Sequence, residues 1–230
     1  MYAWVYEFEH MTTPLPLTAT PDSYSRCADT LRSGGLAILP TDTVYGICAD
    51  ALNDRAVLEL YRAKGKGADA PLQLFFGPAL RDLERFAMPG PLARRVVEAL
   101  GPGAWTLIVP AAPGWASPAL ANGTTVGFRI PNAAIVHEVV RMLGRPIAAS
   151  SANRHGAASP TTCAAALHQL GEFAGCAIDG GPTTAGLDST VIDLADESQP
   201  RILREGAIDR QTVARILGLP EILVLRSVRP

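Results

Sequence analysis

The chain has 230 residues, of which 48% are hydrophobic and 18% charged, an ordinary composition for a soluble globular protein with a core. Its formal net charge is −2, so the total charge does not indicate nucleic-acid or membrane binding, although a local basic cleft is compatible with it. No run of 18 apolar residues occurs, and we therefore expect no membrane span.

Three regions are expected along the chain. Residues 1–20 lack the cationic start of a signal peptide and become rich in Thr and Pro, so we interpret them as a loosely ordered N-terminal tail, with Met11 as an alternative start. Motifs spread over residues 21–217 without a linker, which indicates a single domain. Residues 218–230 are expected to form a short C-terminal extension.

Apolar periodicity and capping signals predict both helices and strands. The first helix, 21–32, follows the cap Thr20 and carries Pro21 in its first turn. In chain order there follow strand 36–39, helix 54–64, strand 72–76, helix 91–100, strands 105–110 and 124–130, helix 133–143, strand 146–149, helix 160–170, strand 190–194 and helix 209–217. Because some strands are adjacent and others are separated by helices, we predict an α/β fold with a mixed sheet.

Polar residues directly follow the buried strand 36–39. The stretch Pro40-Thr41-Asp42-Thr43-Val44-Tyr45-Gly46 brings hydroxyls, a carboxylate and a glycine to the strand end. Such loops are where α/β sheets bind ligands, and hydroxyls can both donate and accept hydrogen bonds. The stretch therefore predicts a site for a small polar ligand, with an ordinary strand-to-loop junction as the alternative.

A second polar loop follows strand 146–149. It contains Ser150, Ser151 and Asn153 and leads into a helix through Ser159-Pro160, a good cap followed by a good first helical residue. A helix N-terminus behind a polar loop is suited to phosphate binding. Capping alone explains Ser159 equally well, but it does not explain the polar run 150–153.

Three cations complete the candidate residues. Lys64 ends helix 54–64 and Lys66 follows it, so both can reach phosphates; solvated charges favoured at a helix C-terminus are the alternative. Arg129 lies within an apolar strand and needs an anionic partner there. A substrate carboxylate suits its planar guanidinium, and an internal salt bridge with Asp42 or Asp188 fits equally well.

The four cysteines, Cys27, Cys48, Cys163 and Cys176, form no CxxC pair and have no spacing typical of zinc ligands. We therefore expect four buried free thiols in a reducing, cytoplasmic protein, and no metal site built by the chain itself.

The polar segments occur in an order that resembles the threonylcarbamoyl-AMP synthase family, the Sua5/YrdC-like proteins of tRNA modification. After the first loop, the matching segments are LYRAKGKG (60–67), PL (71–72), PGAWTLI (102–108), FRIP (128–131), SSAN (150–153), SPT (159–161), DGGP (179–182), DSTV (188–191) and LREG (203–206). The resemblance covers about residues 25–210. It implies a YrdC-like single domain of the short type, in which a twisted mixed sheet flanked by helices surrounds a large concave cleft.

The resemblance also implies an activity. The family's L-threonylcarbamoyladenylate synthases are nucleotidyltransferases that join L-threonine, bicarbonate or CO2, and ATP into threonylcarbamoyl-AMP and pyrophosphate, with Mg2+ assisting. The product passes to a separate threonylcarbamoyl transferase complex, which modifies an adenosine next to the anticodon of certain tRNAs.

By this resemblance, Lys64, Lys66, Ser151 and Asn153 are the expected catalytic residues. The expected ATP-binding residues are these four together with Thr125, Ser159 and Arg204, and the expected threonine-binding residues are Thr43, Arg129 and Ser189.

The sequence departs from the family at three positions. Lys66 and Gly67 stand in place of the arginine and proline of the family's Lys-x-Arg-Pro segment, and Phe75 stands where many members have a histidine. Because lysine lacks the bidentate fork of arginine, these departures leave open a divergent carbamoyl-adenylate enzyme with another substrate. The resemblance itself leaves a second alternative open, a non-catalytic module that binds tRNA or double-stranded RNA through a positive concave face.

Overall fold

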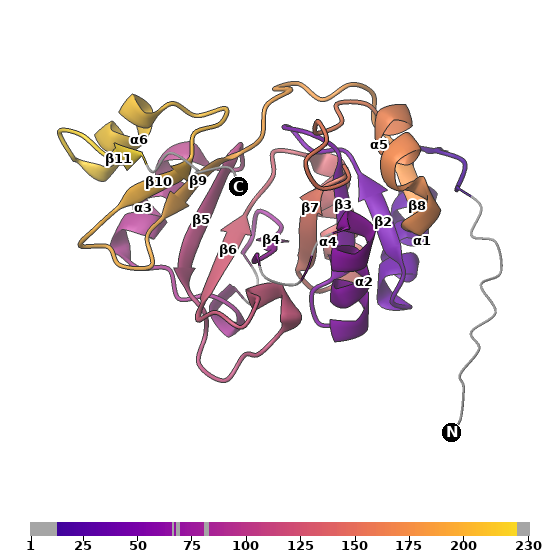
Figure 1. Ribbon diagram of the computed structural model, residues 1–230, viewed down its shortest axis with the longest axis horizontal. Helices are drawn as coiled ribbons and strands as arrows, with labels where there is room; N and C mark the ends of the chain where they lie inside the picture. The colour runs from indigo at the N-terminus through magenta and orange to yellow at the C-terminus, as the bar shows by residue number, and fades with distance from the viewer. Residues whose placement is uncertain (1–12, 66, 68–69, 81–82, 225–230) are drawn as a thin grey trace.

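The computed structural model describes residues 13–65, 67, 70–80 and 83–224 of the chain (Figure 1). The strands are β1 (Leu17–Thr18), β2 (Leu36–Leu39), β3 (Gly46–Asp50), β4 (Gln73–Phe75), β5 (Trp105–Pro110), β6 (Thr125–Arg129), β7 (Ile147–Ser151), β8 (Ala174–Asp179), β9 (Thr190–Asp193), β10 (Arg201–Arg204) and β11 (Leu223–Val224). The α-helices are α1 (Pro21–Arg32), α2 (Asp54–Lys64), α3 (Pro91–Leu100), α4 (Ala134–Leu143), α5 (Cys163–Leu170) and α6 (Arg210–Leu217), and short 3-10 helices are η1 (Leu83–Arg85), η2 (Pro118–Leu120) and η3 (Gly171–Phe173).

The described strands form a sheet of 11 strands in the order β1-β8-β2-β3-β7-β4-β6-β5-β9-β10-β11. Parallel and antiparallel pairs both occur at its centre, where β4 pairs antiparallel with β7 and parallel with β6, and β5 pairs antiparallel with β6 and parallel with β9. The predicted α/β fold with a mixed sheet flanked by helices is therefore confirmed.

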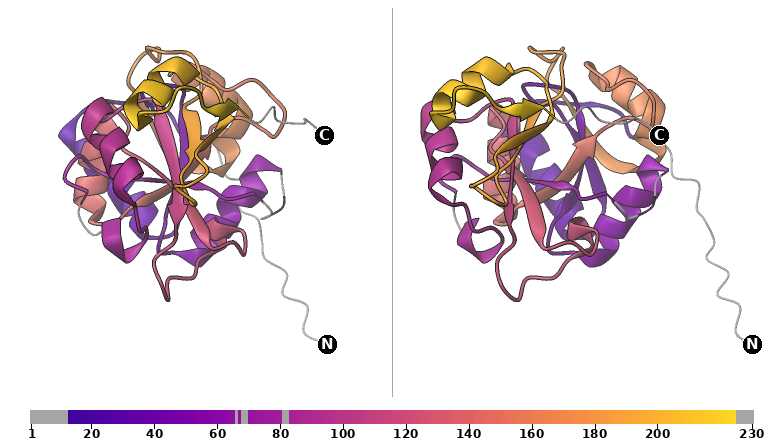
Figure 2. Two further views of the ribbon diagram at one scale, coloured as in Figure 1. Left: turned by 90° about the vertical axis from the view of Figure 1, so that its left-hand side faces the viewer. Right: turned by 60° about the vertical axis from the view of Figure 1, so that its left-hand side comes forward.

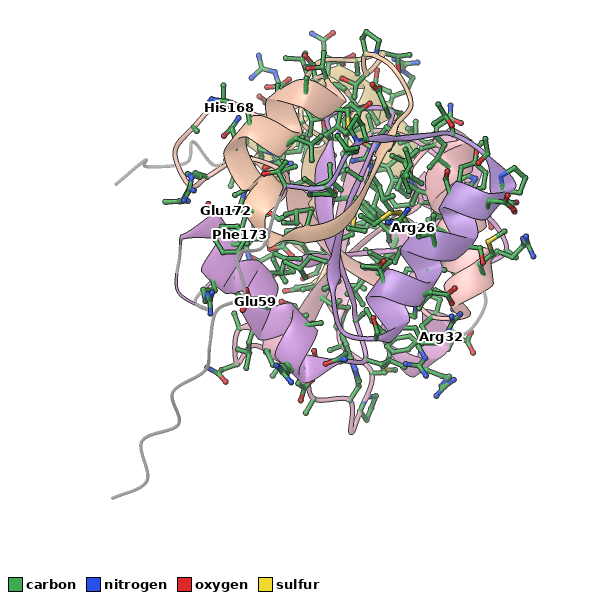
Figure 3. All side chains as sticks on the ribbon, turned by 90° about the vertical axis from the view of Figure 1, so that its right-hand side faces the viewer. Arg26, Arg32, Glu59, His168, Glu172 and Phe173 are labelled. Atoms are coloured by element: carbon green, nitrogen blue, oxygen red, sulfur yellow. A yellow bond between two sulfur atoms is a disulfide. The ribbon has the colours of Figure 1, made fainter. Side chains whose placement is uncertain are left out.

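Helices cover both faces of the sheet. The helices α1 and α4 pack against each other and enclose an apolar cluster over β2, β3, β7 and β8. The helices α2 and α5 lie on the other side of these strands, as the view onto that end of the molecule shows (Figure 3). At the far end, α3 and α6 pack together beside β5, β9 and β10 (Figure 2). None of the described helices is long and apolar enough to cross a membrane.

Five of the strands were not predicted: β1, β3, β8, β10 and β11. Leu17 and Thr18 pair with β8, and Leu223 and Val224 pair with β10, so the sheet takes in residues from both the expected tail and the expected C-terminal extension. The strand β8 is missing from the prediction because its sequence, AGCAID, shows neither alternation nor a long β-branched run. Residues 1–12 and 225–230 lie outside the described part, so the expected boundaries stay predictions.

The expectation of four free thiols is wrong for two of the cysteines. Cys27 on α1 and Cys176 on β8 form a disulfide across a sequence separation of 149 residues, whereas Cys48 and Cys163 are free and buried. The helix α1 packs directly over β8, which brings the two Cα atoms to 5.7 Å, a distance typical of disulfides. Sequence spacing carried no signal for this pair, because the contact depends on a sheet order that joins distant segments.

The helix α2 positions a cation of the candidate site. The side chain of Asn53 caps its first turn by accepting a hydrogen bond from the Ala56 amide. At its other end Gly65 adopts a left-handed conformation, with a φ of +66°, that favours glycine. The helix therefore stops directly after Lys64, as predicted, and Lys64 lies at its C-terminal end.

We predict that the thiol count of the unfolded protein depends on reduction. When protein prepared without reductant is unfolded and treated with a maleimide, two cysteines should react, and all four should react after reduction, because one disulfide protects Cys27 and Cys176. Intact-mass spectrometry measures the number of labels. The Cys163→Ala variant is the matched control and should lose one label under both conditions. Four labels on the unreduced wild type would contradict the disulfide.

Candidate active site

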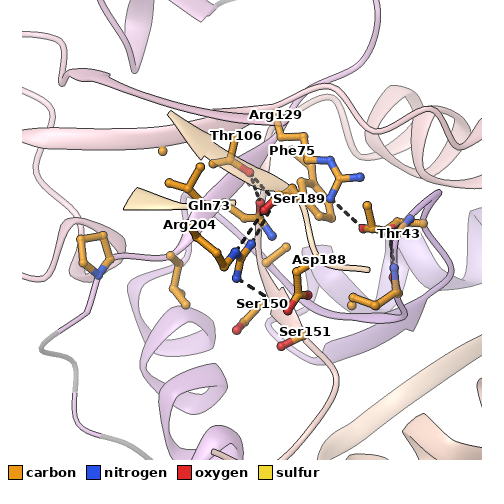
Figure 4. Close-up of a pocket in the computed structure, with 18 of the residues that line it drawn as sticks. Thr43, Gln73, Phe75, Thr106, Arg129, Ser150, Ser151, Asp188, Ser189 and Arg204 are labelled. Carbon is orange, nitrogen blue, oxygen red and sulfur yellow. Dashed lines mark hydrogen bonds and ion pairs between the residues drawn. The ribbon is translucent and has the colours of Figure 1, made fainter. Parts of the chain in front are cut away.

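A cavity of about 300 Å³ opens over the middle of the sheet. Its floor comes from alternate residues of neighbouring strands, because successive side chains of a strand point to opposite faces. Thus 73 and 75 of β4, 106 and 108 of β5, and 125, 127 and 129 of β6 all face it. The loop after β2, the end of α2, and residues of β7, β9 and β10 supply the walls (Figure 4).

Most of the residues predicted to bind substrates line this cavity. They are Thr43, Lys64, Thr125, Arg129, Ser151, Ser189 and Arg204, which the sheet order brings together from six separate parts of the chain. Asn153 and Ser159 are not among the lining residues, and Lys66 lies outside the described residues. The roles expected for these three stay predictions.

Arg129 is held by three partners from two distant parts of the chain. Its side chain is only 2% exposed, and its Nε donates to the Gly103 carbonyl at 2.9 Å. One terminal nitrogen donates to Thr43 Oγ1 at 2.9 Å, and the other pairs with Asp42 at 2.6 Å. Of the two internal salt bridges considered from the sequence, the structure forms the one with Asp42. Since a guanidinium has five N–H groups and three are used here, two are left for a ligand.

Burial shifts the pKa values of two residues in this part of the structure, Arg129 and Tyr45. Burial lowers the pKa of Arg129, while the neighbouring Asp42 carboxylate raises it and so favours the charged form. Burial also raises the pKa of Tyr45 to about 12, so its phenol is neutral at physiological pH. That phenol donates to the Gly181 carbonyl at 2.7 Å and thereby attaches the loop after β8 to the loop after β2.

The loop after β2 fixes the Thr43 hydroxyl. Thr41 Oγ1 donates to the Val44 carbonyl at 2.7 Å and accepts hydrogen bonds from the amides of Thr43 and Val44. With its proton used in this way, Thr41 Oγ1 can only accept from Thr43 Oγ1, 2.8 Å away. Thr43 therefore donates to Thr41 and presents its oxygen to Arg129, so the loop is preorganised by its own hydroxyls.

Lys64 joins α2 to the loop after β7. Its side chain is buried, and Nζ donates to the carbonyl oxygens of Ser151 and Asn153 at 2.6 and 2.5 Å and to Asn153 Oδ1 at 3.1 Å. The Asn153 amide nitrogen donates in turn to the carbonyls of Arg154 and Ala157. Lys64 thus brings its charge to the cavity wall and also holds the polar loop in place.

The expected start of the next helix is wrong. Ser159 does not cap it; α5 begins at Cys163, and Thr162 caps it by accepting a hydrogen bond from the Ala165 amide. The Pro160 carbonyl accepts a hydrogen bond from the Tyr45 amide at 2.8 Å, which holds this segment against the first loop and outside the helix. Ser159 instead lies 3.4 Å from the Asp188 carboxylate.

Arg204 and Asp188 form the opposite wall. Arg204 donates through Nε to the Ser189 carbonyl at 3.0 Å and through a terminal nitrogen to Ser189 Oγ at 3.1 Å. Its other terminal nitrogen lies 3.8 Å from Asp188. Two residues expected at the nucleotide, Ser159 and Arg204, therefore both contact Asp188.

Sequence reasoning missed Gln73 and Thr106, which also line the cavity, as does Asp188, which it had considered as a salt-bridge partner of Arg129. Thr106 Oγ1 donates to Gln73 Oε1 at 2.9 Å and lies 2.8 Å from Ser189 Oγ. A polar residue next to the apolar run 74–76 was the signal that could have identified Gln73. No group of three or more His, Cys, Asp or Glu residues in the described part of the chain could hold a metal ion.

Comparisons with known proteins agree with this geometry. A family model of the Sua5, YciO and YrdC proteins, described as telomere recombination, matches residues 29–206. The threonylcarbamoyl-AMP synthase of Bacillus subtilis is 38% identical over 205 residues, which are 88% of this chain and 58% of that protein. A putative threonylcarbamoyl-AMP synthase of Mycobacterium tuberculosis is 36% identical over 207 residues, which are 87% of this chain and 94% of that protein.

Solved structures give the same result. The crystal structure of Pyrococcus abyssi Sua5 complexed with L-threonine matches with a TM-score of 0.86 and 31% identity, over 92% of this chain and 63% of that one. Escherichia coli YciO matches with a TM-score of 0.75 and 22% identity, over 85% of this chain and 98% of that one, which supports the fold alone. The resemblance found in the sequence is confirmed, and the chain belongs to the Sua5/YciO/YrdC family.

Proposed function

We propose that the protein is an L-threonylcarbamoyladenylate synthase, which forms threonylcarbamoyl-AMP and pyrophosphate from L-threonine, bicarbonate or CO2, and ATP. The observation that carries this proposal is the convergence of the expected threonine-binding and ATP-binding side chains on one cavity. The names of the relatives and the threonine complex of the Pyrococcus protein support the choice of substrate.

The corner at Arg129 is suited to an amino acid. The two unused N–H groups of the guanidinium can bind the α-carboxylate of threonine in addition to Asp42. The Asp42 carboxylate, which is 12% exposed, can attract the ammonium group of an incoming zwitterion. A buried cation and a neighbouring anion thus match the two charges of the substrate.

The wall formed by Lys64, Ser151 and Arg204 is suited to the triphosphate. Arg204 is half-exposed and can turn toward phosphate oxygens, while Lys64 adds a fixed positive charge. Mg2+ would neutralise further charge on the phosphates; it binds through one or two carboxylates and the phosphates themselves, and Asp188 can supply one. By the family resemblance, Lys66 would add a second cation for the phosphates.

The reaction then requires positioning more than covalent chemistry. Threonine and bicarbonate condense to an N-carboxylate with loss of water. An oxygen of this carbamate attacks the α-phosphorus of ATP, and pyrophosphate leaves with the electron pair of the broken P–O bond. Reactions of this kind depend mainly on orientation and charge stabilisation. A cytoplasmic location, delivery of the product to a transferase complex and contact with tRNA or double-stranded RNA belong to the same proposal.

We predict that pyrophosphate release requires both L-threonine and bicarbonate. The protein is incubated with ATP and Mg2+, and each of the twenty amino acids is added with or without bicarbonate while a coupled assay follows pyrophosphate. Release should be confined to threonine with bicarbonate, because the cavity combines an amino-acid corner with a phosphate wall. Equal release with alanine would overturn the assignment of substrate, and no release with threonine would overturn the synthase itself.

We predict that Arg129→Lys weakens threonine binding by about 2–5 kcal/mol, because it loses the planar fork while keeping a charge opposite Asp42. Calorimetry measures the affinities for threonine and for ATP separately, and ATP binding should change much less. The control is Arg201→Ala, which removes a half-exposed arginine outside the cavity. If the folded Arg129→Lys variant binds threonine like the wild type, Arg129 has a structural role only.

We predict that Lys66→Ala weakens ATP binding by about 1.5–3 kcal/mol, the contribution of a hydrogen bond to a charged group. Lys66→Arg should be tolerated, and adding Gly67→Pro should strengthen binding further, because proline would order the loop before ATP binds. Arg55→Ala removes an exposed cation from the first turn of α2 and controls for the loss of net charge. Unchanged ATP affinity in Lys66→Ala would mean that the second cation is not used and would favour a divergent relative.

A further inference from the structure

A chain of four polar side chains crosses the floor of the cavity. It runs from Gln73 on β4 through Thr106 on β5 and Ser189 before β9 to Arg204 on β10 (Figure 4). We call these four residues the polar relay. Thr106 and Ser189 are 4% and 2% exposed, so their hydroxyls depend on each other rather than on water.

The direction of the hydrogen bonds in the polar relay follows from its arginine. A guanidinium only donates, so Ser189 Oγ accepts from Arg204 at 3.1 Å. If Ser189 donates to Thr106 and Thr106 donates to Gln73 Oε1, each hydroxyl has an acceptor for its proton. The reverse direction would leave the proton of the buried Ser189 without an acceptor, which is costly.

This direction fixes the orientation of the Gln73 amide. Its carbonyl oxygen is used by Thr106, so its amino group is left with two N–H donors at the cavity. Among the described residues none accepts a hydrogen bond from this nitrogen. A half-buried amide whose donors meet only the cavity is suited to bind an acceptor oxygen of a ligand.

Small neighbours give this amide its space. In the sheet Gln73 pairs with Gly127 on one side and with Ala149 on the other. A Cβ atom at Gly127 would lie 3.4 Å from Thr106 Cγ2 and 3.9 Å from Gln73 Cβ, so a side chain there would enter the gap that the two residues bridge. The absence of a side chain at Gly127 therefore lets β4 and β5 form a hydrogen bond across β6.

Gln73 lies midway between the two ends of the site. It faces Gly127, which is two residues from Thr125 on the expected ATP side and two residues from Arg129 on the expected threonine side. Two residues of a strand span about 7 Å, roughly the length of a short acyl group. The donors of Gln73 are thus placed where the amino group of threonine would meet the α-phosphate.

We propose that Gln73 is a further substrate-binding residue, whose amide N–H groups bind the carboxylate oxygens of the one-carbon unit between threonine and ATP. The proposal rests on the proposed synthase function. Bicarbonate and the N-carboxylate of threonine both present a planar anion at this point, and both can accept from the amide nitrogen. Arg204, the first donor of the polar relay, is also the residue expected to contact phosphate. A phosphate bound at Arg204 is therefore connected by hydrogen bonds to the amide of Gln73.

Two variants separate this role from a structural one. Gln73→Glu keeps an acceptor for Thr106 but removes the N–H donors, whereas Gln73→Met removes both while staying neutral and similar in length. Pyrophosphate release is measured against bicarbonate concentration at saturating threonine and ATP, and threonine affinity is measured by calorimetry in CO2-depleted buffer without ATP. Gln211→Met, on the exposed face of α6, is the matched control.

Both Gln73 variants should raise the KM for bicarbonate about tenfold or more, the effect of losing a hydrogen bond to a charged group. Threonine affinity in the absence of bicarbonate should change less than about twofold, and Gln211→Met should behave like the wild type. If only Gln73→Met raised the KM for bicarbonate, Gln73 would act solely through the oxygen that accepts from Thr106. That result would overturn the proposal.

Two other results would also overturn it: an unchanged KM in both variants, or an equal loss of threonine affinity without bicarbonate, which would place the amide on the amino acid itself. If the wild type releases pyrophosphate with threonine and bicarbonate but the variants keep its KM, the role of Gln73 is rejected and the synthase proposal stands. A wild type without that activity rejects the synthase and this inference together.

Discussion

The site depends on the hydrogen bonds and the ion pair that hold the buried guanidinium of Arg129. A charge that is 2% exposed must be matched by acceptors, and here they come from the loop before β5, the hydroxyl of Thr43 and the carboxylate of Asp42. These acceptors belong to segments far apart in the sequence. Removing one partner of such a pair leaves an uncompensated charge, which typically costs about 3–5 kcal/mol. The same requirement for acceptors that brings the loops together is the basis of the proposal that Arg129 binds the carboxylate of threonine.

Several side chains at the cavity have a structural role in addition to the chemical role that we propose for them. Lys64 Nζ donates to four oxygen atoms of Ser151 and Asn153 at 2.5–3.4 Å, so its ammonium group both orders the loop after β7 and places a positive charge beside Ser151. Mutational loss of activity at Lys64 would therefore not by itself demonstrate phosphate contact. Arg204 is a clearer candidate for direct contact, because it is half-exposed and, besides its two hydrogen bonds to Ser189, its ion pair with Asp188 is a distant one.

The parts of the fold that depend on local signals could be predicted from the sequence. The helix α2 has a cap at Asn53 and a left-handed glycine after Lys64, and both were read correctly. The start of α5 was misplaced because Ser159 and Thr162 are both good caps, and hydrogen bonds from distant segments, such as that from the Tyr45 amide to the Pro160 carbonyl, hold the stretch before Thr162 outside the helix. The disulfide and the strand β8 could not be predicted, since both depend on which distant strands become neighbours.

The same distinction applies to the candidate site. Arg129 stands out within its own apolar strand and Thr43 within its polar loop, whereas Ser189 was expected from the family resemblance; all three line the cavity. Gln73 was missed because its importance depends on Gly127 and Thr106, which become its neighbours only in the sheet. The direction of the polar relay is likewise a property of the assembled structure, because it follows from an arginine two strands beyond Thr106.

The two outermost strands have a consequence for the behaviour of the protein in solution. The edge strands of a sheet have unpaired backbone N–H and C=O groups, with which strands of other molecules can pair. Here β1 and β11 are the outermost strands of the described sheet, and each has two residues that pair with part of the neighbouring strand. Edge strands this short give another strand little to pair with. A shortened chain that lacked either segment would expose β8 or β10 in full, and self-association of such a fragment would reflect this exposure rather than a natural oligomer.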